Sequence, residues 1–429
     1  MSVGKREIRI GLDARSIFMP RPRGTGRNLG DAYRLIPALR PEWMFHLYHQ
    51  RASAREADAW GANVRLRRID IPGDRYDLWF QVRLPLAARR DHLDLLHLPA
   101  NAAPAWNPVP CVVTVHDLMP LLIDEDQSPR ERRLFERNVR RAVRHAAHII
   151  CPSAATREAL HERYRVARER VTVIPWAADQ GIARRLGGDA TSNGSAQNDD
   201  RGGRSSNAQA EIERVRAAYH LDVDWLLNFS GSSARKNATG VLRGFARVPA
   251  EARAGLRLAL VGCEPASFRT RLEALSRELG IQNQCRLLGF VPHEDLPGLL
   301  GGARGLLMPS LCEGFGLPIL DAFAAGTPVL TSRLSSMPEV AGDAAAYCDP
   351  HDVESVARAI RELLEPERAA ALRRAGRQRL SEFSWERTAR MMCAVYEGCL
   401  LENGRCVAAE YVSPCGRERG VEIGLSENV

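Results

Sequence analysis

Two successive halves of the chain alternate short apolar strands with amphipathic helices, and this alternation constrains the fold more than any other feature. In the first half, strands are predicted at Ile8–Leu12, Leu93–Leu98, Cys111–Val115, Ile149–Pro152 and Val171–Pro175, with helices at Leu29–Leu39, Arg130–Ile150 and Ala154–Tyr164. The second half repeats the pattern between Leu226 and Leu364. Strands separated by helices favour a parallel sheet that is covered on both faces. The predicted fold class is α/β, with two Rossmann-like domains facing each other across a cleft.

Composition predicts where the two domains meet. From Gly187 to Ala210, Ser, Asn, Gly, Gln and Asp replace large apolar residues, which is typical of a flexible segment. We therefore expect a first domain over residues 1–180, a linker or insert over 181–210 and a second domain over 211–384. A last helix is predicted at 385–400, followed by a loose polar tail at 403–429.

The charge balance is mildly basic, with 60 Lys and Arg residues against 52 Asp and Glu residues. This favours anionic partners such as phosphates, nucleotides or an acidic membrane surface, although a solvated basic surface explains it equally well. No apolar run reaches the roughly 18–20 residues of a membrane span, and the first residues lack a signal-peptide core. A cytoplasmic protein is therefore expected, and charge without aromatic interleaving gives no support for a nucleic-acid partner. Ten scattered cysteines without zinc spacing predict free thiols.

Two loops in the second half have residues suited to phosphate binding. Glu313-Gly314-Phe315-Gly316-Leu317-Pro318 follows a predicted strand and opens a helix, whose first N–H groups can bind an anion. In the loop Gly231–Asn237, the adjacent cations Arg235 and Lys236 could neutralise a diphosphate. Two carboxylates, Glu313 and Asp321, are suited to sugar or ribose hydroxyls. The alternatives are a Gly/Pro turn with a charged first turn and a solvated basic loop.

The first half offers one candidate for sugar or proton chemistry. His116 and Asp117 directly follow the strand Cys111–Val115, where a histidine could orient a sugar or handle a proton. A hydrogen-bonded structural histidine is the alternative, and it is the preferred interpretation of His97. The glycines of Gly24–Gly30 begin 12 residues after Leu12, which disfavours a dinucleotide fingerprint. We interpret this stretch as a loop that approaches a substrate or phosphate.

Two further patterns have a structural explanation that is favoured over a functional one. The D-x-D triplets Asp124–Asp126 and Asp222–Asp224 could hold a divalent metal with a nucleotide diphosphate, but their positions relative to strands and helices argue against it. The predicted helix Arg130–Ile150 has seven arginines beside an apolar face. Such a helix could rest on anionic lipid, although a solvated face is the more frequent explanation.

Taken in order, the motifs resemble the large family of retaining, nucleotide-sugar-dependent glycosyltransferases with two Rossmann domains, the GT-B architecture. Bacterial mannosyltransferases typify this family. The resemblance spans about Ile8 to Glu397, without the linker and the tail. The similar segments are Gly11–Arg15, Gly24–Arg27, Val115–Leu118, Cys151–Arg157, Val173–Trp176, Gly231–Asn237, Leu288–Pro292, Glu313–Pro318, Gly326–Val329, Met337–Ala344 and Phe383–Arg387.

The resemblance implies a role for each candidate residue. His116 would lie beside the transferred sugar, Glu313 would hold sugar hydroxyls, and Lys236 with Arg235 would bind the diphosphate. The implied donor-binding residues are Gly26, Gly231, Val291 near the base, Gly314, Phe315, Gly316, Leu317 and Asp321. The family usually has a glutamate on the ribose where this chain has Asp321, which is one methylene shorter. The helix from Trp385 to Leu400 resembles a terminal helix that crosses back to the first domain.

The resemblance also implies a reaction. Asp77–Pro85 and Leu98–Pro104 are similar to the mannosyltransferase branch of polysaccharide assembly, so GDP-mannose is the first expected donor and a UDP-hexose the second. The acceptor would be a glycan or a polyprenyl-linked oligosaccharide at the inner face of the membrane, and neither a cofactor nor a metal is expected. Two alternatives remain: a sugar-nucleotide epimerase with the same two-domain fold, and a degenerate homologue that binds without catalysis, which Asp321 suggests.

Overall fold

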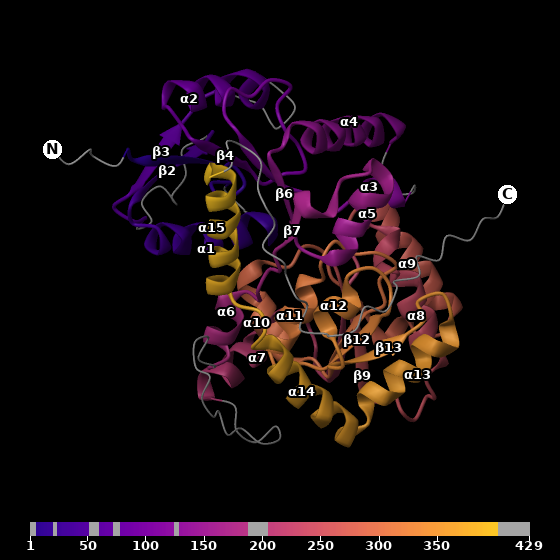
Figure 1. Cartoon of the computed structure of the whole chain (residues 1–429). Coiled ribbons are helices and arrows are strands. Elements are labelled where there is room, and N and C mark those ends of the chain that lie inside the picture. Colours follow the sequence, from indigo (N-terminus) through magenta and orange to yellow (C-terminus); the bar gives the residue numbers. More distant parts are fainter. Residues whose placement is uncertain are drawn as a thin grey trace. The chain divides into compact units, whose positions relative to one another are not determined.

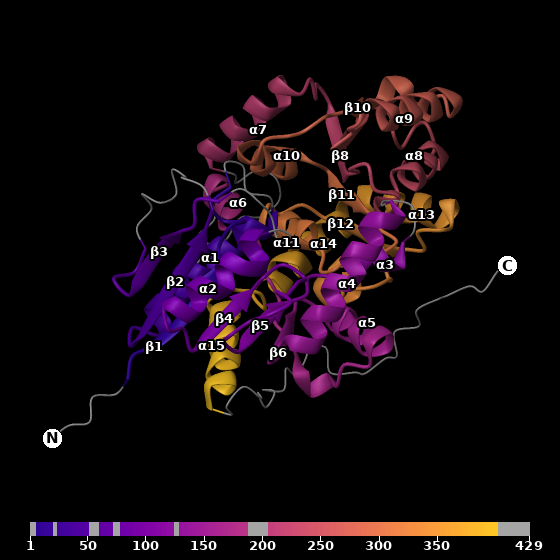
Figure 2. The ribbon, with the colours of Figure 1, turned by 90° about the horizontal axis from the view of Figure 1, so that it is seen from above.

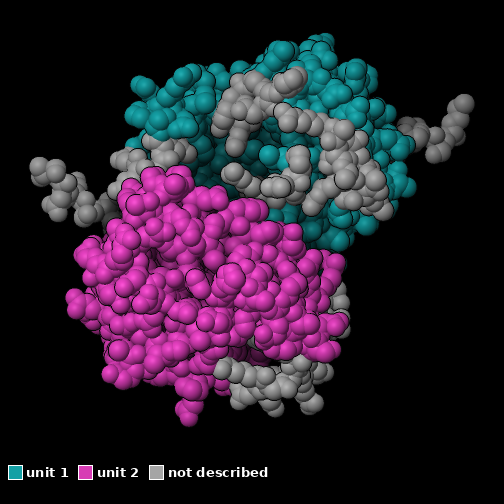
Figure 3. Space-filling view, turned by 180° about the vertical axis from the view of Figure 1, so that it is seen from behind, with its two compact units in different colours: residues 1–177, 383–413 teal, residues 178–382, 414–429 magenta. Residues whose placement is uncertain are grey.

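The computed structural model describes residues 6–19, 24–50, 60–71, 78–123, 128–187 and 205–401 (Figure 1). These residues form two compact units, which Figure 3 distinguishes by colour. Unit 1 extends to Ala177 and resumes at Phe383, whereas unit 2 runs from Ala178 to Glu382. The Asp124–Asp126 triplet and the predicted tail at 403–429 lie outside the described residues.

Unit 1 contains a parallel sheet of seven strands in the order β3-β2-β1-β4-β5-β6-β7. The strands are β1 (Ile8–Asp13), β2 (Trp43–His49), β3 (Val64–Arg68), β4 (Leu95–Leu98), β5 (Cys111–Thr114), β6 (His148–Cys151) and β7 (Val171–Val173). Strand order reverses between β1 and β4, and loops at the carboxyl ends of strands beside such a reversal commonly bind ligands.

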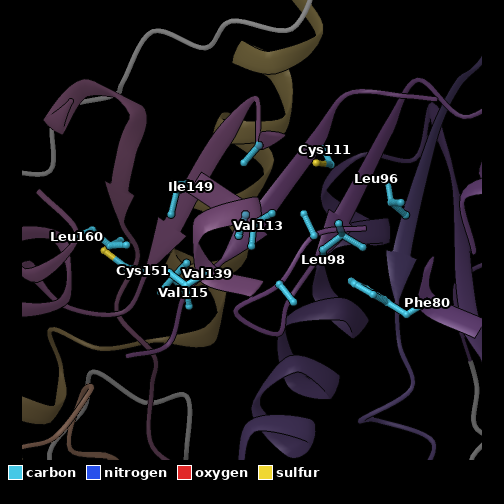
Figure 4. Close-up of a cluster of buried hydrophobic side chains, with 14 of the residues drawn as sticks. Phe80, Leu96, Leu98, Cys111, Val113, Val115, Val139, Ile149, Cys151 and Leu160 are labelled. Carbon is cyan, nitrogen blue, oxygen red and sulfur yellow. The ribbon is translucent and has the colours of Figure 1, made fainter. Parts of the chain in front are cut away.

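Helices cover both faces of this sheet. They are α1 (Gly24–Leu39), the π-helical turn η2 (Trp79–Arg83), α2 (Leu84–Arg90), α3 (Met119–Leu122), α4 (Pro129–His145), α5 (Ala154–Tyr164) and α15 (Trp385–Leu401). The helices α1 and α15 pack together, and α15 also contacts β4. On one face of the sheet, a hydrophobic core joins η2, α2, α4 and α5 to the strands. Figure 4 shows Phe80, Val113, Val139 and Leu160 within this core.

Unit 2 contains a parallel sheet of six strands in the order β10-β9-β8-β11-β12-β13. The strands are β8 (Asp224–Phe229), β9 (Leu256–Val261), β10 (Cys285–Leu287), β11 (Gly305–Met308), β12 (Val329–Ser332) and β13 (Ala345–Cys348). The helices are α6 (Gln180–Arg185), α7 (Ser206–Ala218), α8 (Ala238–Arg247), α9 (Ala266–Glu278), α10 (Leu296–Gly302), α11 (Leu317–Ala324), α12 (Met337–Ala341), α13 (Val353–Leu364) and α14 (Pro366–Leu380). The predicted α/β class with two Rossmann-like sheets is confirmed (Figure 2).

Three local predictions are wrong. The stretch Gly24–Gly30 is the start of α1 and not a loop, because its buried residues recur at helical spacing with those that follow. Helix α7 begins at Ser206, inside the segment expected to be a flexible linker, since the Ser205 hydroxyl caps it and α7 packs on α10. Helix α4 ends at His145, because the next residue is extended and leads into β6.

Candidate active site

In unit 2, the predicted phosphate-binding loops lie at the carboxyl ends of the adjacent strands β8 and β11. Strand order reverses at this pair, so the two loops lie next to each other although they are far apart in sequence. The amide N–H of Leu311 donates to the Arg235 carbonyl at 2.8 Å. The Asn237 side-chain amide donates to the Pro309 carbonyl at 3.2 Å and to the Pro350 carbonyl at 2.8 Å. These bonds fix one loop against the other.

Glu313 is the centre of a buried ion cluster at this edge. One carboxylate oxygen, Oε2, lies 2.6 Å from Arg235 Nη1, and the other, Oε1, lies 2.6 Å from Lys236 Nζ. The Ser310 hydroxyl donates to Oε1 at 3.0 Å. The Glu313 side chain is 7% exposed and those of its two cationic partners are 20% and 16% exposed. The structure therefore brings together three of the four predicted catalytic residues.

Burial and charge act against each other in this cluster. Burial alone would raise the pKa of Glu313, but the cations Lys236 and Arg235 reverse this and hold its pKa below the ordinary value. Burial lowers the pKa of Lys236, and Arg235 lowers it further, although Glu313 opposes both. Since two cations share one carboxylate, the cluster carries a net positive charge, which suits it to an anionic ligand.

Two serines that follow β12 bind the backbone of the loop after Glu313. The hydroxyls of Ser335 and Ser336 donate to the Glu313 carbonyl at 2.6 and 2.9 Å, and Ser336 also donates to the Phe315 carbonyl at 2.7 Å. Gly316 precedes α11 with φ of 115°, a conformation that side chains other than glycine rarely adopt. The chain can thereby turn sharply and start α11 at Leu317, so that the first amides of the helix follow the ion cluster directly.

Two other predicted donor residues lie along the same edge of the sheet. Gly231 follows β8 with φ of 53°, and a Cβ added to Gly262 would lie 3.2 Å from its backbone. Gly262 donates its N–H to the Gly289 carbonyl at 3.0 Å, which connects the loops after β9 and β10. Val291, two residues further on, is buried. Small residues thus permit three loop backbones to approach one another closely.

Asp321 lies in the second turn of α11 and contacts the segment before α6. Its Oδ1 accepts a hydrogen bond from the amide N–H of Asp179 at 3.0 Å. The Asp179 carboxylate, in turn, lies 2.8 Å from His293 Nε2. The structure therefore gives Asp321 a contact within the fold, and its predicted contact with a ribose stays a prediction.

In unit 1, His116 occupies the carboxyl end of β5 and is fixed by backbone contacts. Its Nε2 lies 2.8 Å from the Pro99 carbonyl, which can only accept, so Nε2 carries the proton. Its amide N–H donates to Asn101 Oδ1 at 2.6 Å, and Asn101 has φ of 56°. The His116 ring stacks on Trp176 with ring centroids 5.8 Å apart. The contacts of Nε2 and of the ring face thus fix the orientation of the imidazole.

The first turn of α15 supports the surroundings of His116. The Trp385 ring lies 5.8 Å from the Trp176 ring, and the Thr388 hydroxyl donates to the Pro175 carbonyl at 2.7 Å. Trp176 and Trp385 lie in segments that resemble the family, but no sequence motif predicted this contact. Gly26, a predicted donor residue, is buried in the first turn of α1. Its role at a donor stays a prediction.

The structural interpretation of His97 is confirmed. His97 is fully buried, and its ring nitrogens contact the hydroxyls of Tyr33, Tyr396 and Thr114 at 2.7–2.9 Å. Burial lowers the pKa of His97 to about 3, so the ring is neutral at physiological pH. In the second D-x-D triplet, Asp222 pairs with Arg257 at 3.4 Å and Asp224 with Arg304 at 3.3 Å. Among the described cysteines, all eight are free thiols.

Lysine usage is a signal that the sequence analysis missed. The chain has 58 arginines but only two lysines, and one of these is Lys236. An ammonium group is a compact point charge, whereas a guanidinium is a planar fork that is nearly always charged. One of the two lysines therefore occupies the position of the most buried cation of the cluster. No sequence pattern predicted the serines that bind this cluster and its loop, because serines have no distinguishing spacing here. These serines are Ser310, Ser335 and Ser336.

Two family models match this chain, one on each unit. The model described as "Glycosyl transferases group 1" matches residues 220–379, and "Glycosyltransferase Family 4" matches residues 32–180. The chain belongs to this glycosyltransferase family. Within the described residues, no helix is both long and apolar enough to cross a bilayer.

Individual relatives and solved structures agree with this assignment. The chain is 29% identical to O-antigen chain mannosyltransferase B of Escherichia coli over 75% of this chain and 78% of that protein. A glycosyltransferase from Rickettsia africae superposes with a TM-score of 0.66 at 15% identity, covering 93% of this chain and 100% of that one. Anabaena HepE in complex with UDP and glucose superposes with a TM-score of 0.63 at 18% identity, covering 91% and 100%. At these identities the two structures show the GT-B fold alone.

Proposed function

We propose that this glycosyltransferase transfers mannose, with retention of configuration, from GDP-mannose to a glycan or a polyprenyl-linked oligosaccharide during polysaccharide synthesis. The observation that carries the proposal is the buried cluster of Glu313 with Arg235 and Lys236, at the strand reversal of unit 2. The similarity to an O-antigen mannosyltransferase supports mannose as the sugar. A cluster with net positive charge, followed by the amides of a helix start, suits a diphosphate.

The geometry suggests how the cluster responds to the donor. An incoming diphosphate competes with the Glu313 carboxylate for Lys236 and Arg235, so the carboxylate becomes available to accept hydrogen bonds from sugar hydroxyls. As the sugar–phosphate bond breaks, negative charge develops on the diphosphate, and the two cations with the amides at Gly316 and Leu317 stabilise it. The acceptor hydroxyl attacks from the same face of the sugar, and the departing phosphate takes its proton. His116 lies beside the transferred sugar in this proposal.

A UDP-hexose donor is the second candidate. The observation in its favour is that Anabaena HepE, which shares the fold, was solved with UDP and glucose. The two donors differ in base and in sugar, whereas the diphosphate chemistry assigned to Lys236 and Arg235 is common to both. The choice between them therefore depends on the residues around the base, where Val291 is the candidate.

Calorimetric titration tests the proposal directly. GDP-mannose, GDP, UDP-glucose and UDP are titrated into the whole protein, with and without EDTA. Guanine-selective binding that survives EDTA and is lost in Lys236→Ala supports the proposal. The matched control is Arg243→Ala, which removes an exposed cation from α8 in the same unit. Selective binding of the uracil nucleotides would identify a UDP-hexose as the donor instead of GDP-mannose. Nucleotide binding without any product that depends on an acceptor would favour a non-catalytic protein.

A further inference from the structure

The carboxyl edge of the unit 1 sheet carries a buried ion pair that the proposed transfer step does not use. Asp13 is the last residue of β1, one of the two strands at which strand order reverses, and its side chain is 5% exposed. Arg15 Nε donates to Asp13 Oδ1 at 3.0 Å, and Arg15 Nη2 donates to Asp13 Oδ2 at 2.8 Å. The two groups form a bidentate pair, in which the carboxylate cancels the charge of the guanidinium.

Aromatic rings of η2 hold the Arg15 guanidinium in place. Its Cζ lies 4.0 Å from the centroid of the Trp79 ring and 5.2 Å from that of the Phe80 ring. Trp79 is itself anchored, because its Nε1 donates to the Ile69 carbonyl at 3.1 Å. The remaining nitrogen of the guanidinium, Nη1, makes no hydrogen bond within the part of the chain that the structure describes. Since the Arg15 side chain is 14% exposed, Nη1 is an oriented donor that a ligand can reach.

The loop after β4 offers a second oriented donor, the side-chain amide of Asn101. Asn101 is 9% exposed, and its Oδ1 accepts the amide N–H of His116 at 2.6 Å. This bond identifies which end of the amide is the oxygen, so Nδ2 is the opposite end. Among the described residues, Nδ2 has no hydrogen-bond partner. A side chain that is nine-tenths buried and has two unused N–H groups indicates the position of a ligand.

The strand register brings these two donors to the same part of the edge. Leu12 of β1 is paired with His97 of β4, so the segments that follow the two strands leave the sheet side by side. Arg15 lies three residues after Leu12, and Asn101 lies four residues after His97. Both donors therefore follow the strands at which strand order reverses in unit 1, and ligands commonly bind at such a reversal.

We propose that Arg15 and Asn101 bind hydroxyl groups of the acceptor glycan and select an uncharged sugar at its terminus. Sugar hydroxyls accept hydrogen bonds from N–H groups that are held in one orientation. Because Asp13 cancels the charge of Arg15, this pair attracts a phosphate or a uronate less than the unit 2 cluster does, where one carboxylate faces two cations. The inference rests on the proposed function, since that function takes the acceptor to be a glycan.

Two conservative variants and a matched pair of sugars test the proposal. Methyl α-D-mannopyranoside and its anionic counterpart, methyl α-D-mannopyranosiduronate, are titrated by saturation-transfer NMR into the full chain in the presence of GDP. We expect the neutral sugar to bind more tightly than the uronate. Arg15→Lys keeps a cation on Asp13 but lacks a second nitrogen. Asn101→Asp keeps the oxygen that accepts the His116 amide but replaces the donor by an acceptor. Each variant should weaken binding of the neutral sugar by roughly tenfold.

Matched controls make the same chemical changes elsewhere. Arg6→Lys alters an arginine that pairs with Asp94 at 2.6 Å next to the amino end of β1, and Asn283→Asp adds a negative charge at an exposed position of unit 2. Both controls should bind the neutral sugar as the unmodified protein does. Thermal denaturation verifies that each variant is folded. Calorimetric titration of GDP-mannose should give the same affinity in all variants, because donor binding is assigned to unit 2.

Four outcomes would overturn the proposal. The first is the absence of binding of the neutral sugar to the unmodified protein. The second is unchanged binding in both variants, which would leave the ion pair and the amide with a purely structural role. The third is tighter binding of the uronate that Arg15→Lys abolishes. The fourth is weaker binding of GDP-mannose in both variants, because the two residues would then contact the donor.

The same data separate this proposal from the proposed function. If GDP-mannose fails to bind while binding of the neutral sugar depends on Arg15 and Asn101, the donor assignment is wrong and the sugar site of unit 1 stands. If GDP-mannose binds and the neutral sugar does not, the donor assignment stands and the sugar site is wrong.

Discussion

The two units have closely similar sheets, but the polar groups at the carboxyl ends of their strands differ in kind. Unit 2 places two cations and one carboxylate within 2.6 Å contacts in a buried cluster. Unit 1 places a histidine there, held by a carbonyl, an amide side chain and a tryptophan ring. In the proposed reaction, unit 2 would provide charge for an anionic leaving group, while unit 1 would provide an oriented imidazole.

Removing the buried ammonium group should have the largest effect. Lys236→Ala leaves Glu313 paired with Arg235 alone, which cancels the net positive charge of the cluster. We expect kcat/KM to fall by roughly a hundredfold or more, because the developing phosphate charge loses a buried partner. Steady-state kinetics with donor titration measures this. Lys236→Arg should retain part of the activity, and unaltered kinetics in Lys236→Ala would refute the charge assignment for unit 2.

Changing His116 of unit 1 should affect kcat more than donor affinity. His116→Ala is expected to lower kcat by roughly tenfold to a hundredfold, as the loss of an oriented polar group at the reacting sugar predicts. The dissociation constant of the nucleoside diphosphate should change little. His351→Ala, an exposed histidine of unit 2, is the control. If nucleotide affinity fell as steeply as kcat, the division of roles between the units would be wrong.

The pH dependence should distinguish the two sides. Because burial and Arg235 lower the pKa of Lys236, its ammonium loses its proton at a lower pH than the 10.5 of an ordinary lysine. Diphosphate binding to the free protein should therefore weaken as pH rises, with a midpoint below that value. Titration calorimetry over an alkaline pH series measures the midpoint. In Lys236→Arg the alkaline decrease in diphosphate affinity should move to higher pH. An unchanged midpoint in this variant would mean that another group causes the decrease.

The smallest effect is expected at Asp321. Asp321→Ala removes the acceptor of the Asp179 amide, and the free energy of unfolding should fall by about 1 kcal/mol. Thermal denaturation should show a Tm lower by a few degrees, with nucleotide affinity nearly unchanged. A large loss of affinity at constant Tm would instead support ribose binding. In Asp321→Glu, increased turnover would mean that the shorter side chain impairs the reaction.

The sequence predicts strands best where they are buried on both faces. Strand β5 is apolar from Cys111 to Val113, and the predicted span Cys111–Val115 matches it to within a residue. Two strands were not predicted: β2, which contains two histidines, and the edge strand β3, which contains three arginines. The arginines of β3 are tolerated because an edge strand stays partly solvated, whereas the two histidines of β2 are buried polar residues that break an apolar pattern.

The site residues were found by local motif, but their arrangement was not. Glu313 and Lys236 lie 77 positions apart, and only the neighbouring positions of β8 and β11 bring them together. No local pattern encodes that strand order. The sequence also suggested separate roles for Glu313 and the two cations, whereas the structure shows them bonded to one another.

Unit 1 is assembled from both ends of the described chain, and this has a consequence for its synthesis. His97 of β4 contacts the hydroxyl of Tyr396 on α15, and Arg40 of unit 1 pairs with Glu397. These partners leave the ribosome roughly 300 residues after β4 does, whereas the described residues of unit 2 all lie between Ala178 and Glu382. Unit 2 can therefore complete its core while the helix that unit 1 requires is still being translated. The order in which the units mature is thus the reverse of the order in which they begin.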